Sequence, residues 1–184
     1  MNYTDTTQLI DHCRGGNESA VAELVDQYKD GVFRLALSVL DDEAEANEAA
    51  QDAFIAALGA LESYRDGSSF KAWLYTITLN ASRSRLRKRK TLAALRATLQ
   101  SIFRIQTQKI PSPEELVVQN EQDAAIWQAL ERLGERHRLP VVLRYYHELS
   151  MAEIAGILGI NEGTVRSRLH TAHDRLRGLL EEQE

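Results

Sequence analysis

The spacing of apolar residues is the feature that most constrains how this chain folds. An α-helix places every third or fourth residue on one face, whereas a half-buried strand alternates at every second residue. No alternation of the second kind persists along the chain, and only three prolines interrupt its 184 residues. The helical spacing is clearest at Ala20, Leu24, Tyr28, Val32, Leu35 and Val39. We therefore expect an all-α fold.

Several helices of the first half can be delimited from local signals. A short helix is expected over 6–14, ending at Gly15-Gly16, and a longer one begins at Asn17 or Ser19. Asp41 and Asp42 are candidate N-caps for a helix that runs to about Glu62. A turn at 64–69 then leads into a helix that starts at Phe70 and continues through the basic residues. The helix that is capped by Asp41 or Asp42 is expected to bury Ala46, Ala50, Ala53, Phe54, Ala57 and Leu61.

Residues 91–113 divide the chain. The segment begins with a weak helical pattern, becomes polar and ends in Pro-Ser-Pro, which stops a helix. We interpret it as a flexible linker that joins two small helical domains, 1–90 and 114–184. A further helix is expected from about 113 to 133, at the start of the second domain.

Charge is distributed very unevenly along a chain whose net charge is −5. Residues 1–66 hold 14 acidic and 4 basic residues, and residues 111–184 hold 13 acidic and 8 basic residues. In contrast, residues 67–110 hold 10 basic residues and no carboxylate. A basic block of this length is typical of a protein that binds a polyanion. A basic helical face neutralised by the acidic first third is the alternative interpretation.

The segment from Ser150 onward predicts two helices joined by a tight turn. Ser150 and Glu153 form a capping-box pattern, Gly159 suits the left-handed end of a helix, and Asn161 can cap the next one. This spacing is typical of a DNA-binding helix-turn-helix, although an ordinary helical hairpin shares it. The polar residues that would face phosphates and base edges are Asn161, Thr164, Arg166, Ser167, Arg168 and His170.

Several function classes lack support in the sequence. The single cysteine cannot form an internal disulfide, which fits a reducing cytoplasm. No metal-ligand spacing, phosphate-binding glycine loop or catalytic histidine–acid–nucleophile grouping is found, so we expect no cofactor, no metal and no enzymatic activity. The sequence also has no apolar run of membrane-spanning length and no signal-peptide pattern.

Two groups of motifs together resemble one protein family. QDAFIAAL (51–58), SSFKAWLYTITLN (68–80) and RLRKRK (85–90) resemble conserved region 2 of the extracytoplasmic-function (ECF) sigma factors of bacterial RNA polymerase. LGERHRLPVVLRYYHELSMAEIAGILGINEGTVRSRL (133–169) resembles region 4. Parts of the second segment also occur in response regulators, but both segments in this order are specific. The chain is accordingly identified as a member of the ECF family.

The resemblance implies a role for each surface. The helix through 47–54 would bind the coiled coil of the largest polymerase subunit, although Phe54 suits core packing equally well. The −35 element would be read in its major groove by the polar residues from Asn161 to His170 named above. Polymerase contacts would come from Asn47, Glu48, Gln51, Asp52 and Phe54. The melted −10 element would be bound by Tyr64, Ser68, Ser69, Phe70, Lys71, Asn80, Arg83, Arg85, Arg87 and Lys88.

The implied partners follow from the same resemblance. They are core RNA polymerase, through its largest-subunit coiled coil and its flap, promoter DNA, and a separate anti-sigma factor. In the family the linker threads toward the RNA exit path, whereas a small independent helix is the alternative for residues 99–105. A stand-alone helix-turn-helix regulator with a helical sensor or dimerisation domain is the alternative function.

Overall fold

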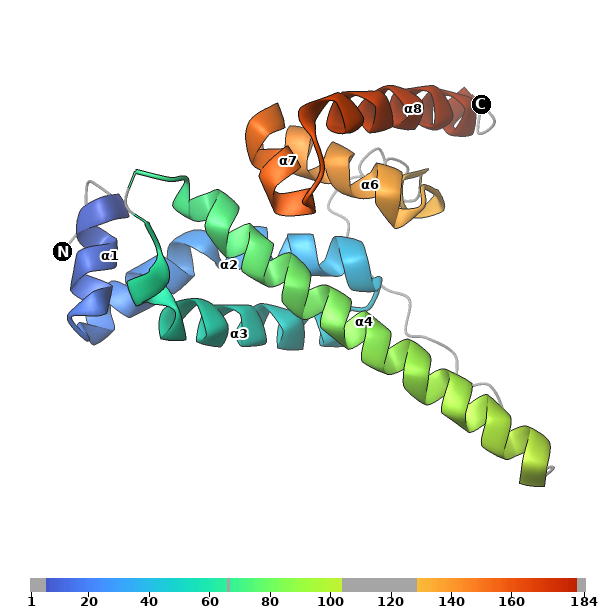
Figure 1. Cartoon of the computed structure of the whole chain (residues 1–184), viewed down its shortest axis with the longest axis horizontal. Coiled ribbons are helices and arrows are strands. Elements are labelled where there is room, and N and C mark those ends of the chain that lie inside the picture. The colour runs from blue at the N-terminus through green and yellow to red at the C-terminus, as the bar shows by residue number, and fades with distance from the viewer. Residues whose placement is uncertain (1–5, 66, 104–128, 182–184) are drawn as a thin grey trace.

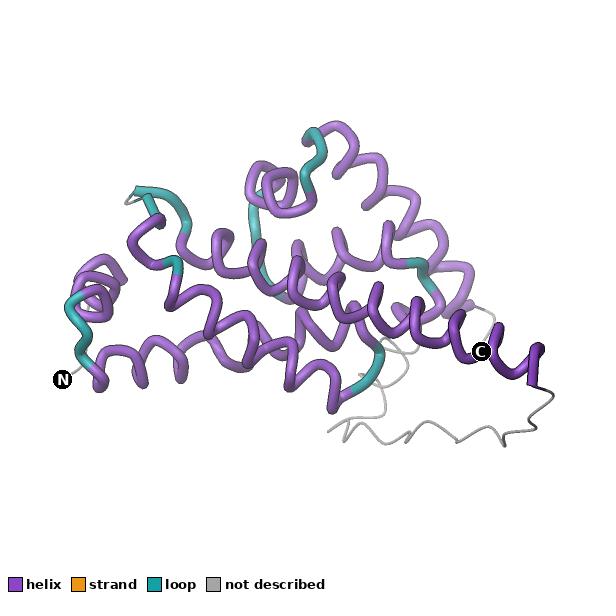
Figure 2. Tube along the Cα trace, turned by 60° about the horizontal axis from the view of Figure 1, so that its bottom comes forward, coloured by secondary structure: helices purple, strands orange, loops and turns teal. Residues whose placement is uncertain are grey.

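The helices of the protein form two groups, which Figures 1 and 2 show from two directions. The structure is a computed structural model that describes residues 6–65, 67–103 and 129–181, with side chains to residue 92 and over 129–179. The first group contains α1 (Thr6–Arg14), α2 (Glu18–Leu40), α3 (Glu43–Gly59), the 3₁₀ turn η1 (Leu61–Ser63) and α4 (Phe70–Phe103). The second contains α6 (Glu135–Val141), the π-helical turn η2 (Val142–Tyr146), α7 (Met151–Leu158) and α8 (Glu162–Glu181). No strand occurs in these residues, and the all-α prediction is confirmed.

Helices α2, α3 and α4 pack together to form the first core. α3 returns alongside α2, and α4 crosses both (Figure 1). Leucines and valines of α2 and α4 fill the space between the helices, with Leu35 and Leu74 almost fully buried. The side of α3 that faces them consists of small residues, which let the helices approach closely. These buried alanines are Ala46, Ala49, Ala50, Ala53 and Ala57.

The caps of the first group explain where its helices begin and end. The side chain of Asn17 accepts from the Ala20 amide at the start of α2, and Asp42 accepts from the Glu45 amide at the start of α3. Only Asp42 is therefore an N-cap, because Asp41 ends α2 in the left-handed conformation at φ 50°. Helix α3 ends at Gly59, a few residues before the predicted Glu62, and η1 follows it.

Helix α4 continues beyond the predicted start of the linker at residue 91. It runs to Phe103 because TLAALRATL, which follows the basic residues, is rich in strong helix formers. The first part of the predicted linker is therefore helical, and the domain boundaries themselves remain a prediction. Most of the helix expected over 113–133 lies outside the described residues, although 129–132 are helical.

The second group has a core of its own. Leu139, Leu143, Ile154 and Val165 are almost fully buried where α6, η2, α7 and α8 meet. The capping box of Ser150 with Glu153 is present, so this local prediction is confirmed.

The turn between α7 and α8 also matches the sequence prediction. Gly159 ends α7 at φ +65°, a conformation that disfavours a side chain. The Asn161 side chain then accepts from the Thr164 amide at 2.7 Å. Together these two residues fix how the chain enters α8.

Replacing Ser150 with Ala is expected to destabilise the protein by about 1 kcal/mol, because the Glu153 amide loses its partner and the capping box is broken. Thermal unfolding followed by circular dichroism measures the change. Ser19→Ala in α2 is the control, since Ser19 lies inside a helix whose cap is Asn17. Equal unfolding temperatures for Ser150→Ala and the unmodified protein would contradict the prediction.

The two groups contact each other directly. Helix α7 packs on α4, while α6 and η2 pack on α2. Among the described residues, no helix combines the length and apolar character needed to cross a membrane.

Candidate nucleic-acid and protein-binding surfaces

The first turns of α8 present the residues predicted to read duplex DNA. Asn161, Arg166, Ser167 and His170 are exposed, whereas Thr164 and Arg168 are half-buried. On the opposite side, Val165 and Leu169 anchor the helix in the core. The structure therefore brings the predicted −35 residues together on one helix beside the turn at Gly159. This arrangement suits insertion into a major groove.

The loop between η1 and α4 is supported by a cluster of aromatic rings. Tyr64 and Phe70 are 7% and 4% exposed, and their rings lie 5.3 Å apart edge to face. Tyr28 packs on Phe70, and the half-buried Trp73 packs on both Tyr64 and Phe70. Because Tyr64 and Phe70 are buried, their rings lie beneath the loop and do not form an exposed surface on which a base could stack. Their contact with the −10 element remains a prediction.

Hydrogen bonds fix the shape of the same loop. The Tyr64 hydroxyl donates to the Ser68 carbonyl, and the Ser69 hydroxyl accepts from the Ala72 amide at the start of α4. Arg14 of α1 donates to the carbonyls of Leu61, at 3.4 Å, and Tyr64, at 2.8 Å. Sequence reasoning missed Arg14, because nothing in a single basic residue at a helix end indicates a partner fifty residues away. Ser68 and Ser69 remain exposed on this supported loop.

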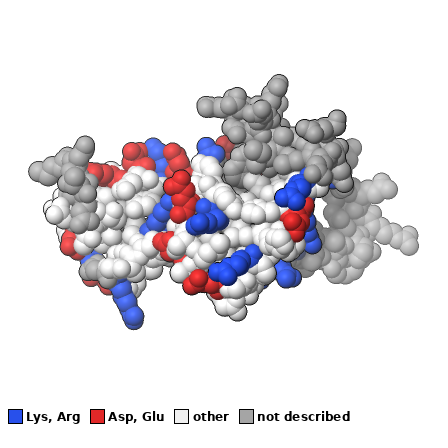
Figure 3. Space-filling view, turned by 90° about the horizontal axis from the view of Figure 1, so that it is seen from above, with Lys and Arg blue, Asp and Glu red and all other residues white. Residues whose placement is uncertain are grey.

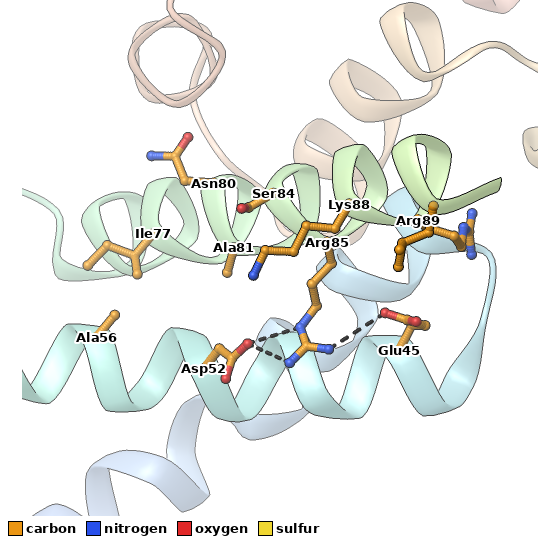
Figure 4. Close-up of a pocket in the computed structure, with 11 residues that line it drawn as sticks. Glu45, Asp52, Ala56, Ile77, Asn80, Ala81, Ser84, Arg85, Lys88 and Arg89 are labelled. Atoms are coloured by element: carbon orange, nitrogen blue, oxygen red, sulfur yellow. Dashed lines mark hydrogen bonds and ion pairs between the residues drawn. The ribbon is translucent and has the colours of Figure 1, made fainter. Parts of the chain in front are cut away.

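The basic residues of α4 do not share one environment. Arg87 and Lys88 are exposed, as is Asn80. Arg83 forms an ion pair with Glu135 of α6, with 3.0 Å between Nε and Oε1. Arg85 instead reaches across to α3, where it bonds to Asp52 and Glu48 and lies 3.6 Å from Glu45 (Figure 4). The sequence grouped these residues as a single basic run and could not distinguish their directions.

A surface groove of about 740 Å³ lies along the contact between α3 and α4. Arg85 spans it, and its apolar part is lined by Ala56, Ile77 and Leu92. Leu92 is one of the large apolar residues that are exposed in the described part of the chain. A groove that combines apolar side chains with charges of both signs suits a protein partner.

The face of α3 that points away from the core extends this surface. Asn47, Glu48, Gln51 and Asp52 are all exposed, as their predicted role in binding a protein requires. The sequence left open whether Phe54 binds polymerase or packs in the core. Its side chain is half-buried against the core, between these two alternatives. Ile55, which the sequence analysis did not select, is 69% exposed. The sequence could have indicated a binding role for Ile55, since this isoleucine lies one turn after Gln51 on a polar helix face.

Charges of both signs are interspersed over the surface. Figure 3 shows lysines and arginines beside aspartates and glutamates on the face seen from above. Within the described residues, the contact of Arg85 with α3 is one place where the acidic first third neutralises the basic block. No cluster of three or more metal-binding side chains occurs in the described part of the chain.

Two family models match this chain, one in each helical group. Sigma-70 region 2 matches residues 24–91, and Sigma-70 region 4 matches residues 129–178. The ECF RNA polymerase sigma factor SigW of Bacillus subtilis is 35% identical over 176 residues, which are 93% of this chain and 94% of SigW. The chain belongs to the ECF family of RNA polymerase sigma factors. This confirms the resemblance found in the sequence, and the region 2 match leaves the stand-alone regulator without support.

One further relative and two solved structures also match this sigma factor over most of both chains. The sigma-E factor of Escherichia coli is 31% identical, with 91% of this chain and 90% of the relative covered. The solved structure of CnrH in complex with the cytosolic domain of CnrY has a TM-score of 0.67 at 25% identity, covering 96% and 97% of the two chains. The sigma factor RpoE, solved in complex with the anti-sigma factor NepR from Bartonella quintana, shares the fold with a TM-score of 0.68 at 24% identity, covering 87% of this chain and 96% of RpoE.

Proposed function

We propose that this sigma factor binds core RNA polymerase through the exposed face of α3, the melted −10 element through the loop before α4 and α4 itself, and the −35 duplex through α8. The observation that supports this assignment best is that regions 2 and 4 match separate helical groups, each with a surface of suitable chemistry. The protein would act where polymerase and DNA are found, in the cytoplasm, without catalytic residues of its own.

Recognition of the −35 element is assigned to the exposed donors of α8. Arginine binds guanine through two hydrogen bonds in the major groove, and serine or threonine hydroxyls bind phosphates or bases. Arg166 and Ser167 are exposed on the second turn of the helix.

Replacing Arg166 with Ala is expected to weaken binding to the −35 duplex by about 10- to 100-fold, the usual effect of losing one bidentate base contact. Fluorescence anisotropy with a labelled duplex from a mapped promoter measures the affinity. Arg177→Ala is the matched control, because Arg177 is an exposed arginine at the other end of α8. An equal loss in both variants would show that Arg166 contributes only charge.

Binding of the melted −10 strand is assigned to the supported loop and to α4. Ser68 and Ser69 offer hydroxyls at the surface, Lys71 offers an ammonium group, and Arg87 and Lys88 are exposed farther along the helix. Serines can hydrogen-bond an unstacked base, while the basic side chains attract phosphates without reading sequence. Asn80 is exposed between these two parts of the surface.

Control by a separate anti-sigma factor is proposed from similarity. RpoE, which shares the fold, was solved in complex with an anti-sigma factor. The groove between α3 and α4, which is partly apolar, and the exposed Ile55 are surfaces of the kind that a protein partner covers.

Reconstituted transcription tests the whole proposal. Core polymerase is mixed with this protein and genomic DNA, and the starts of the transcripts are sequenced. The proposal requires that the protein elutes with core polymerase and that the upstream regions share two motifs. Failure to bind core polymerase would overturn it.

A further inference from the structure

We propose that Arg85 of α4 positions the carboxylates of α3 that bind polymerase and does not bind the −10 element. Its place in the basic run 83–90 grouped Arg85 with the −10 residues in the sequence. The inference rests on the proposed assignment of the α3 face to polymerase, and it deepens that assignment by adding a residue from the DNA-binding helix.

Three carboxylates of α3 surround the Arg85 guanidinium. Its Nε and Nη2 atoms donate to Asp52 Oδ2 at 2.9 and 2.6 Å, and its Nη1 atom donates to Glu48 Oε2 at 2.5 Å. Glu45 Oε2 lies 3.6 Å from the same Nη1 atom. Figure 4 shows the side chain reaching from α4 to Asp52 and Glu45. We call these four residues the Arg85 cluster.

The Arg85 cluster is a poor site for a DNA phosphate. Three carboxylates and one guanidinium leave the cluster with a net charge of −2. A phosphate would have to approach these carboxylates and replace charge-assisted hydrogen bonds that are already formed. Arg87, two positions further along the same helix, is exposed. Phosphates should therefore be attracted to Arg87 and not to Arg85.

The three carboxylates of the cluster lie on one face of α3. Positions 45, 48 and 52 are three and four residues apart, so consecutive members of the set are neighbours on the helix surface. Like charges at this spacing repel one another, and the guanidinium between them offsets that repulsion. Without Arg85, we expect the carboxylates to move apart and to sample several rotamers.

The cluster leaves its carboxylates accessible to a partner. The side chains of Glu48 and Asp52 are 64% and 52% exposed, whereas the side chain of Arg85 is 23% exposed. A side chain that is already held in one rotamer loses less conformational entropy when a partner binds. Arg85 thus holds Glu48 and Asp52 in place while their exposed parts remain available to polymerase.

Replacing Arg85 with Ala separates polymerase binding from DNA binding. Surface plasmon resonance with immobilised core polymerase should show binding weakened by about 3- to 10-fold, because two carboxylates lose their fixed positions. Promoter opening is then measured with enough of the variant to saturate core polymerase, by the permanganate reactivity of unpaired thymines at a mapped promoter. This reactivity should match that of the unmodified holoenzyme within about twofold, because phosphates bind elsewhere on α4.

Two further variants control for the loss of charge. Lys29→Ala also removes one positive charge and an exposed ion pair, with Asp26 of α2, but it lies outside the proposed surfaces and should change neither measurement. Arg87→Ala removes an exposed arginine of α4 and should reduce promoter opening. A solvent-accessible ion pair adds little to stability, so circular dichroism should give similar unfolding temperatures for all of these variants.

A double-mutant cycle tests whether Arg85 acts through its carboxylates. In the Glu48→Ala, Asp52→Ala background, Arg85→Ala should weaken polymerase binding by less than about a further twofold, because the side chains that it positions are gone. A role of Arg85 in helix packing alone would instead weaken binding equally in both backgrounds.

The possible results separate this inference from the proposed function. The inference is overturned if Arg85→Ala leaves polymerase binding unchanged, if it lowers promoter opening by the saturated holoenzyme, or if its loss is equal in both backgrounds. If Glu48→Ala, Asp52→Ala binds polymerase normally, the proposed role of these carboxylates fails and the inference fails with it. If that variant binds weakly while Arg85→Ala binds normally, only the inference fails.

Discussion

Replacing Ile55 with Asp is expected to weaken binding of core RNA polymerase by about 30-fold or more. Ile55 is 69% exposed on α3, one turn after Gln51 and Asp52, which are proposed to bind polymerase. An exposed apolar side chain beside polar groups suits the centre of a protein interface, where truncating a hot-spot residue costs about 2 kcal/mol or more. A buried carboxylate at that centre would add a desolvation penalty.

The change should affect binding and not folding, because Ile55 contributes little to the core. Surface plasmon resonance with immobilised core polymerase measures the affinity, and circular dichroism compares the unfolding temperatures. Ala22→Asp is the matched control, since Ala22 is exposed on α2 and acquires the same charge. Unchanged polymerase binding by Ile55→Asp would remove α3 from the proposed interface.

Acidification from pH 7 to pH 5 is expected to weaken the packing of the second helical group on the first at His147 by about 2 kcal/mol, or roughly 30-fold. His147 is 3% exposed, and its burial, together with the positive charges of Lys71 and Arg34, lowers its pKa to about 4. When the two groups separate, the ring is hydrated and its pKa returns toward the ordinary value of 6.5. The packing between the groups is therefore fully stabilised above pH 6.5 and loses stability as the pH falls toward 4.

The neighbours of His147 support the same direction. Tyr75 faces the ring from α4, and burial raises its pKa, so the hydroxyl keeps its proton throughout this range. The Tyr146 ring is edge to face with His147, and Arg34 lies over Tyr146. Glu153 faces Lys71, and although burial opposes it, hydrogen bonds from Ser150 hold the pKa of that carboxyl below its ordinary value. None of these groups is therefore expected to stabilise the protonated form of His147 at pH 5.

Small-angle X-ray scattering across pH 5–8 measures this response as a change in the radius of gyration. His147→Gln should remove most of the pH dependence, because no imidazole then changes charge at the contact. His137→Gln is the control: burial and nearby arginines lower the pKa of His137, but this ring lies in the second group away from Tyr75. A pH profile that disappears in His137→Gln and persists in His147→Gln would refute the assignment.

Local features of the fold were predicted well because they depend on neighbours in the chain. The capping box at Ser150, the left-handed Gly159 and the Asn161 cap each involve residues at most five positions apart. Their physical cause, an unsatisfied amide or carbonyl at a helix end, is visible in a short window of sequence. The continuation of α4 to Phe103 differs from the linker predicted to start at residue 91, because the helix formers of TLAALRATL extend the helix well before Pro-Ser-Pro is reached.

The amino-acid sequence by itself determined the helical fold, the two groups of motifs and the family, because periodicity and short motifs are properties of neighbouring residues. Only the tertiary structure decided which basic side chains are free. Arg85 turns toward α3, Arg83 and Lys71 toward the second group, and Arg87 remains at the surface. An arginine is attracted to whichever carboxylate or carbonyl the fold brings within about 3 Å, and a partner dozens of positions away leaves no local signal in the chain.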